Sequence, residues 1–263
     1  MRGRFRRSLG SALFCLPWLV FAQQEPVVVT YSTNPGYPPY HWAVSETAFD
    51  GASIELLELV RPAGVTFKAL VYPWKRVLAL AADGQIDMLL SLRKTPEREE
   101  FLNFVPHRAF ANPIAVFVRE DRRFRFSNWN SLQGRQGGYS AGDTFGGGFD
   151  EFLRLNLTME GAPSMENNFR KLLLGRIDYF VTGYYTGMTY VQSHPEAGVI
   201  SALQPMISDQ AIHFAFSKKS AHQGLIAEIN RKLEALDRKG VPDALLKKHL
   251  ERFAGTPPVI RLP

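Results

Sequence analysis

The chain has 263 residues, of which 31 are basic and 25 acidic, so its formal charge is +6 at neutral pH. Four of the basic residues are arginines among the first ten residues, and the rest of the chain has 27 basic against 25 acidic residues, or +2. This near balance removes the main support for nucleic-acid binding. The single cysteine, Cys15, also lies near the N-terminus, so the remaining chain has neither disulfides nor thiolate metal sites.

Residues 1–22 have the pattern of a secretory signal peptide. An arginine-rich start is followed by an apolar stretch too short to span a bilayer, and then by Val20-Phe21-Ala22, with small residues where a signal peptidase cleaves. Phe14 precedes Cys15, where a lipoprotein signal would need a small residue. We therefore expect a periplasmic protein that begins at Gln23 and carries no lipid.

Strand and helix patterns alternate along the rest of the chain. β-Rich or apolar runs predict strands at 27–31, 65–72 and 86–90, whereas apolar residues at helical spacing predict helices at 54–60, from Trp74, at 149–157, and at 225–236. Lys239-Gly240 is a typical helix end, and 241–253 is a further amphipathic helix. The fold class is therefore α/β, and the length suffices for one large or two medium domains.

One pattern occurs twice. Residues 76–91 and 168–182 share an apolar helix, a Gly-x-Ile-Asp turn and an apolar strand. Two copies of one helix-to-strand unit predict two lobes of similar build, although a single continuous sheet could also hold both. The polar segment 119–134 between them is a plausible crossing from one lobe to the other.

The stretch 91–100, SLRKTPEREE, follows the apolar strand at 86–90 and contains a Thr-Pro pair. It could be a solvated charged turn, or it could present Arg93 and Arg98 at the rim of a sheet. Alternation along an extended segment would place Ser91 and Arg93 on one face. Arg93 could instead pair with Glu97 or Glu99.

Two loops offer further candidate sites. Residues 138–142 fit the G-x-S-x-G pattern of hydrolases, but no apolar strand leads into them, so a serine hydrolase is a poor fit. The same region, with Asp143, Thr144 and three glycines before a helix, suits an anion-binding loop or a plain surface loop. The loop 34–42 carries Tyr37 and two more aromatics on a proline-stiffened backbone, which suits ligand stacking or core packing. The six histidines are scattered and indicate no metal site.

In this order and spacing, the motifs resemble those of the periplasmic solute-binding proteins of family 3, which have the type II periplasmic-binding fold. The resemblance extends from Val27 to Phe253. The motifs that carry it are Tyr37-Pro38-Pro39-Tyr40, Gly51-Ala52-Ser53-Ile54-Glu55-Leu56, Pro73-Trp74-Lys75-Arg76, Gly84-Gln85-Ile86-Asp87, Thr95-Pro96-Glu97-Arg98, the loop at Gly142, Gly175-Arg176-Ile177-Asp178 and Phe214-Ala215-Phe216-Ser217-Lys218.

The resemblance implies two lobes, each a mixed sheet flanked by helices, hinged by two crossover strands, with a small molecule bound between them. Lobe 1 would be residues 23–117 plus 214–263, and lobe 2 residues 118–213. By position, Tyr37 matches an aromatic that stacks on the ligand, Arg98 the arginine that pairs with its carboxylate, Thr144 a second carboxylate contact, and Ser91 a polar group at the rim. The full set of expected ligand-binding residues is Asn34, Tyr37, Trp74, Ser91, Arg93, Arg98, Asp143, Thr144 and Tyr184.

The chain also departs from the family pattern. Where amino-acid binders usually carry acids that meet the ligand's ammonium, this chain has Gly183 and Asn34, and Arg93 replaces a small hydroxyl residue. The expected ligand is therefore a net anion, such as a dicarboxylate or acidic amino acid.

The resemblance implies a monomeric binding protein without a cofactor. Its partner would be an ABC permease in the inner membrane or, alternatively, a membrane sensor. A lyase similar to cyclohexadienyl dehydratase is the enzymatic alternative, and Asp143 would be its general acid or base.

Overall fold

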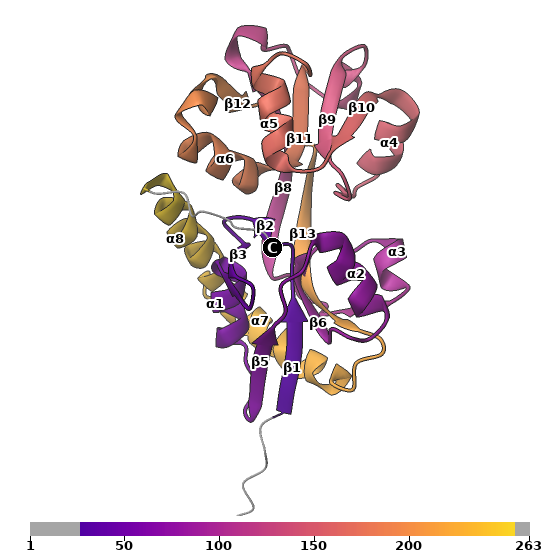
Figure 1. The fold of residues 1–263 in the computed structure, drawn as a ribbon, viewed down its shortest axis with the longest axis vertical. Coiled ribbons are helices and arrows are strands. Elements are labelled where there is room, and N and C mark those ends of the chain that lie inside the picture. The colour runs from indigo at the N-terminus through magenta and orange to yellow at the C-terminus, as the bar shows by residue number, and fades with distance from the viewer. Residues whose placement is uncertain (1–26, 256–263) are drawn as a thin grey trace, which may run out of the picture.

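The computed structural model describes residues 27–255, so the expected signal peptide at 1–22 lies outside the described residues. The described chain forms two lobes, drawn one above the other in Figure 1, that are joined by two long strands, β8 (Phe110–Arg119) and β13 (Ser208–Ser217). The expected α/β class and two-lobed architecture are confirmed. Within the described residues, no helix combines the length and apolarity needed to cross a membrane.

The first lobe contains the part of the described chain that precedes β8 and the two C-terminal helices. Its strands are β1 (Val27–Ser32), β2 (Gly36–Tyr37), β3 (His41–Ser45), β4 (Ala48–Asp50), β5 (Val65–Ala69), β6 (Met88–Leu92) and β7 (Leu102–Phe104). Its helices are α1 (Ala52–Leu59), α2 (Trp74–Ala82), α3 (Pro96–Glu99), α7 (Ile226–Asp237) and α8 (Val241–Gly255), with a short 3₁₀ turn, η4 (Gln223–Leu225).

The second lobe lies between the two long strands in the sequence. Its strands are β9 (Gln136–Ser140), β10 (Thr158–Ala162), β11 (Tyr179–Gly183) and β12 (Ile200–Ala202). Its helices are α4 (Phe149–Asn156), α5 (Met165–Leu173) and α6 (Tyr184–Ser193), with the 3₁₀ turns η1 (Glu120–Arg122), η2 (Trp129–Leu132) and η3 (Pro195–Val199).

One curled mixed sheet runs through both lobes in the order β10-β9-β11-β8-β13-β6-β1-β5. Some pairs within each lobe, such as β1 with β5 and β9 with β10, are parallel, whereas β8 and β13 are antiparallel to each other. The first half of β8 pairs with β13, and its second half pairs with β11 and β12. The crossing therefore lies inside β8 and β13, and the division after residues 117 and 213 stays a prediction.

The polar segment 119–134 is not the crossing. It follows β8, and its Phe126 and Leu132 are buried in a second-lobe core with Val116 and Val118. The expectation that this segment links the lobes was wrong, because its two buried apolar side chains attach it to the second-lobe core.

The repeated helix-to-strand pattern has the same structural role in both lobes. Gly84 and Gly175 end α2 and α5 with positive φ angles of 79° and 66°, which glycine adopts without strain. The carboxylate of Asp87 then accepts from the Thr30 N–H (2.9 Å), and that of Asp178 accepts from the Gln136 N–H (2.8 Å). Each aspartate thus fastens its strand to the neighbouring parallel strand.

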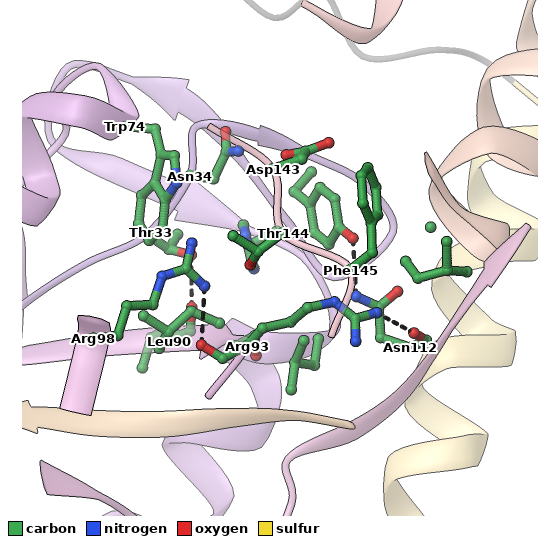
Figure 2. Close-up of a pocket in the computed structure, with 17 residues that line it drawn as sticks. Thr33, Asn34, Trp74, Leu90, Arg93, Arg98, Asn112, Asp143, Thr144 and Phe145 are labelled. Atoms are coloured by element: carbon green, nitrogen blue, oxygen red, sulfur yellow. Dashed lines mark hydrogen bonds between the residues drawn. The ribbon is translucent and has the colours of Figure 1, made fainter. Parts of the chain in front are cut away.

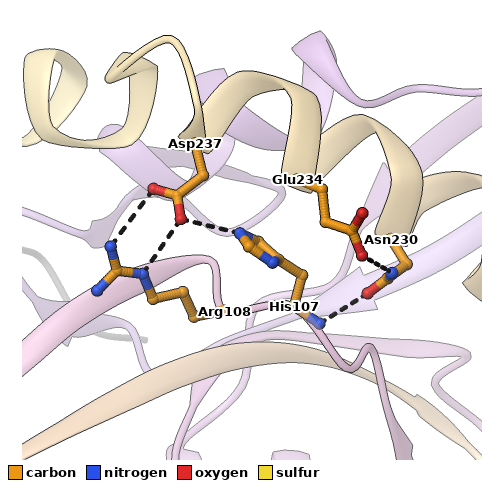
Figure 3. Close-up of polar contacts among 5 residues, drawn as sticks. All are labelled: His107, Arg108, Asn230, Glu234 and Asp237. Carbon is orange, nitrogen blue, oxygen red and sulfur yellow. Dashed lines mark hydrogen bonds and ion pairs between the residues drawn. The ribbon is translucent and has the colours of Figure 1, made fainter.

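A polar cluster fastens the segment that leads into β8 (Figure 3). Asp237 on α7 accepts hydrogen bonds from His107 Nε2 (2.9 Å) and from the Arg108 guanidinium, while the His107 N–H donates to Asn230 Oδ1 (2.7 Å). These hydrogen bonds attach the segment just before β8 to helix α7 of the first lobe.

Candidate functional site

A small cavity of about 50 Å³ lies between the lobes, and a neighbouring cavity of about 290 Å³ shares four of its lining residues. The shared residues are Asn34, Tyr37, Trp74 and Asp143. Side chains from β6 and the following turn, from the loop after β9, and from β8 point toward one another here (Figure 2). The two spaces together suit a small ligand with one polar end.

The turn after β6 positions Arg98. Thr95 is the N-cap of α3 and accepts from the Arg98 N–H (3.3 Å), and Pro96 occupies the first helical turn. The Arg98 guanidinium lies over Trp74, with its Cζ 5.7 Å from the ring centroid, and its Nη1 donates to the Arg93 carbonyl (2.9 Å). Only 9% of Arg98 is exposed, so the charged-turn interpretation does not hold for this residue.

Arg93 is even more buried, at 6% exposed, and reaches toward the strand β8 (Figure 2). Its Nη2 donates to the Asn112 carbonyl (2.5 Å), whereas its Nη1 is buried without a hydrogen-bond partner among the described residues. Burial lowers the pKa of both arginines, but a guanidinium in a protein stays protonated at neutral pH. An unpartnered guanidinium N–H in a cavity calls for an acceptor.

Neither arginine forms an ion pair within residues 27–255. The acids of the same turn point elsewhere, since Glu99 pairs with Lys94 at the surface (2.9 Å) and Glu97 is exposed. Two desolvated cations thus face the cavity without a salt bridge, a costly arrangement unless a ligand supplies an anion.

The loop after β9 contributes the side chains of Asp143 and Thr144. Two backbone donors of this loop are already used, because Asp150 accepts from the Phe145 N–H (2.9 Å) and the Gly146 N–H (2.7 Å). The anion-binding role of the loop stays a prediction. Burial raises the pKa of Asp143 to about 6, against the opposing effect of Arg98 and Arg93. The Thr144 hydroxyl is buried and has no partner among the described residues.

A chain of hydroxyls connects the rim of the cavity to a buried histidine. Ser91 Oγ lies 2.6 Å from Ser53 Oγ, which lies 3.3 Å from His41 Nδ1. Burial lowers the pKa of His41 to about 3, so the imidazole is neutral near pH 7. Ser91 has a φ of 49°, uncommon for a non-glycine residue and typical of residues at binding sites. Ser91 and Arg93 both line the cavity, but so do Leu90 and Leu92, so strand alternation does not explain their placement.

The corner of the cavity at Gly183 is lined by polar side chains. Tyr37 Oη accepts from Asn112 Nδ2 (2.9 Å), and a Cβ at Gly183 would lie 2.7 Å from Tyr37 Oη and 2.9 Å from Asn112 Oδ1. Tyr37 also stacks on Tyr40, with ring centroids 5.6 Å apart. Its ring is therefore fixed, with the hydroxyl in this corner.

Eight of the nine expected site residues line the cavity, and their role in binding stays a prediction. The exception is Tyr184, which begins α6 and packs on a second-lobe core. The sequence interpretation missed Asn112 and His41, which also line the cavity. An asparagine within the apolar run of β8 was the available signal for Asn112.

The hydrolase pattern gains no support from the structure. Ser140 ends β9 and is followed by a loop, not directly by a helix, and the cavity that it lines has no histidine among its described lining residues. Within residues 27–255, no cluster of three or more histidine, aspartate or glutamate side chains could hold a metal ion.

The family model for bacterial extracellular solute-binding proteins, family 3, matches residues 29–252 of the chain. A comparison with curated protein sequences finds no match.

Several solved structures share the fold at low sequence identity. An amino acid ABC transporter substrate-binding protein, AbpA from Streptococcus pneumoniae, bound to L-arginine, is 18% identical with a TM-score of 0.71, covering 86% of this chain and 96% of that one. A histidine kinase sensor domain with similarity to periplasmic binding proteins is 20% identical with a TM-score of 0.70, covering 86% and 97%. An ancestral amino acid-binding protein, AncCDT-1, described as a precursor of cyclohexadienyl dehydratase, is 18% identical with a TM-score of 0.68, covering 85% and 95%.

Proposed function

Because the chain belongs to family 3 of the bacterial extracellular solute-binding proteins, we propose that it captures a small, net anionic carboxylate between its two lobes in the periplasm. The ligand would bridge the turn after β6 and the loop after β9, and would stabilise the closed arrangement of the lobes by binding it better than the open one. No cofactor is needed for this role.

The observation that carries the proposal is the pair of buried arginines without ion pairs. Arg93 and Arg98 line one cavity with a single acid, Asp143. If Asp143 is ionised, the three charges sum to +1, and if it is protonated they sum to +2. A ligand with one or two carboxylates restores neutrality, whereas a cationic amino acid would add to the excess.

The partner would be an ABC importer in the inner membrane. The neighbouring S. pneumoniae structure is a transporter component, and most neighbours are binding proteins, which supports import over catalysis. The likeness to a histidine kinase sensor domain supports the alternative that the closed protein signals through a membrane sensor. Growth of a deletion strain on the identified ligand as sole carbon source separates import from sensing. A strain that has lost an import protein cannot take up the ligand, whereas loss of a sensor alone does not abolish uptake.

A lyase on the same fold is the second candidate, and Asp143 is the observation that favours it. A cavity carboxyl with a pKa near 6 suits a general acid or base at neutral pH. One solved structure with this fold is that of AncCDT-1, a precursor of cyclohexadienyl dehydratase, so a dehydratase reaction is the one to test. Incubation with prephenate-like acids tests this: turnover that is lost in Asp143→Asn supports the lyase, and binding without turnover supports the binding protein.

A thermal-shift screen of carboxylic acids and amino acids at neutral pH tests the main proposal. We expect stabilisation by at least one dicarboxylate or acidic amino acid and none by lysine, arginine or histidine. Bound ligand stabilises the folded state by mass action, so a ligand at about 100 times its Kd adds about 2.7 kcal/mol. Stabilisation by cationic amino acids alone would overturn the proposal.

A further inference from the structure

Four polar groups lie around Gly183 in one corner of the cavity, and some of them have no hydrogen-bond partner among the described residues. Around the Cα of Gly183 lie Tyr37 Oη, Asn112 Oδ1 and Thr186 Oγ1, at 2.7, 2.9 and 3.6 Å from the position of a Cβ. Asn112 and Thr186 are each 1% exposed. Asn112 Oδ1 and Thr186 Oγ1 have no hydrogen-bond partner among the described residues. The fourth group is the Arg93 guanidinium, which donates to the Asn112 carbonyl.

The charge of this corner is already positive. Arg93 Nη1 is buried without a partner, and the carboxylate of Asp143 does not form an ion pair with it in the described chain. The pKa of Asp143 rises despite the two arginines, so the acid does not fully offset their charge. A ligand ammonium in this corner would lie beside a guanidinium in a desolvated site and would repel it.

The unpartnered oxygens in the corner are neutral acceptors. An amide oxygen and a threonine hydroxyl accept from a ligand hydroxyl without any change in charge. An ammonium also donates to such oxygens, but it brings a buried charge that no carboxylate in the corner compensates. The acceptors therefore suit an uncharged donor that accompanies a carboxylate.

We infer that the Arg93 guanidinium and the neutral acceptors beside it make this site select carboxylic acids with a hydroxyl group in place of the amino group. This inference rests on the proposed function, since it names the substrate class of the same cavity. The carboxylate would be held by Arg98 and Arg93, and the hydroxyl would face Asn112 Oδ1 and Thr186 Oγ1. The protein would then bind hydroxy acids and discriminate against the amino acids of the same shape.

Calorimetric titration of the wild-type protein with three matched pairs tests the inference. The pairs are L-malate with L-aspartate, L-2-hydroxyglutarate with L-glutamate, and L-lactate with L-alanine, in which a hydroxyl replaces an ammonium. We expect the hydroxy acid of the best-bound pair to bind about tenfold or more tightly than its amino acid, because an uncompensated buried charge costs at least this much.

Equal or tighter binding of the amino acid would overturn the inference and leave the proposed anion-binding function intact. Binding of neither member of any pair, together with binding of lysine or arginine, would overturn the proposed function and the inference with it.

The variant Asn112→Asp provides a second readout. It places a carboxylate in the corner at almost unchanged volume, so it should reduce the preference for the hydroxy acid at least threefold and improve amino acid binding. Asn130→Asp, on the exposed turn η2, makes the same charge change away from the cavity and should leave the preference unchanged. An unchanged preference in Asn112→Asp, in a protein that still binds the hydroxy acid, would contradict the inference.

Discussion

Replacing Arg98 with alanine is the most informative single change to the cavity. The guanidinium lies over Trp74 and uses Nη1 to hold the Arg93 carbonyl, so its other donors are available to a ligand carboxylate. A charge-assisted hydrogen bond contributes about 1.5–3 kcal/mol. We therefore expect Arg98→Ala to weaken binding of the preferred acid roughly 10- to 150-fold.

Calorimetric titration with the acid identified in the thermal-shift screen measures this loss. Arg98→Lys keeps the charge but loses the planar fork, so its affinity should lie between those of the wild type and Arg98→Ala. Arg231→Ala removes an exposed arginine on α7 and should bind as the wild type does. Equal affinity of Arg98→Ala and Arg231→Ala would refute the assignment of Arg98 to the carboxylate.

Three further changes test other parts of the account. Anion binding favours protonated Asp143, so the affinity for the acid should rise as pH falls through about 6. Calorimetry at about pH 7.5 and 5.5 should show a smaller change in affinity for Asp143→Asn than for the wild type. An equal change in both proteins would show that Asp143 is not the titrating group. Tyr185 on α6 packs on the first-lobe core, with its ring centroid 6.4 Å from that of Tyr40. Tyr185→Ala should therefore weaken binding severalfold without altering the cavity. Unchanged affinity would show that this contact between the lobes does not support closure. Burial acts to raise the pKa of Asp237, but hydrogen bonds from His107 and Arg108 lower it overall, so Asp237→Asn should reduce the free energy of unfolding by about 1 kcal/mol at pH 7. That difference is present above the ordinary aspartate pKa and should disappear as pH falls through the lowered value, which urea titrations at several pH values measure; a difference that persists in acid would contradict the reasoning.

Much of the first-lobe half of the site could be predicted because local sequence determines it. Thr95 and Pro96 start a helix wherever they occur in such a context, and this places Arg98 one turn into it. Ser91 and Arg93 were expected at the cavity and both line it, although Leu90 and Leu92 line it too. The repeated Gly-x-Ile-Asp pattern likewise predicted equivalent units, because both glycines end helices and both aspartates precede strands.

The parts that were missed depend on contacts between distant segments. Asn112 enters the cavity because β8 crosses between the lobes, and its partner Tyr37 lies 75 residues earlier in the chain. Asp150, one residue inside α4, accepts from the N–H groups of Phe145 and Gly146, so two donors of the predicted anion-binding loop are already used. Tyr184 starts α6, and the direction of its side chain follows from packing on the second-lobe core, which no local pattern specifies.

The central claim is that the cavity between the lobes holds a net anionic carboxylate, and mass spectrometry of the molecule that co-purifies with the exported protein tests it most directly. The protein is purified without added ligand, denatured, and the released small molecules are identified. We expect a carboxylic acid with a negative net charge at neutral pH. Release of lysine, arginine or another cationic molecule in stoichiometric amount would contradict it.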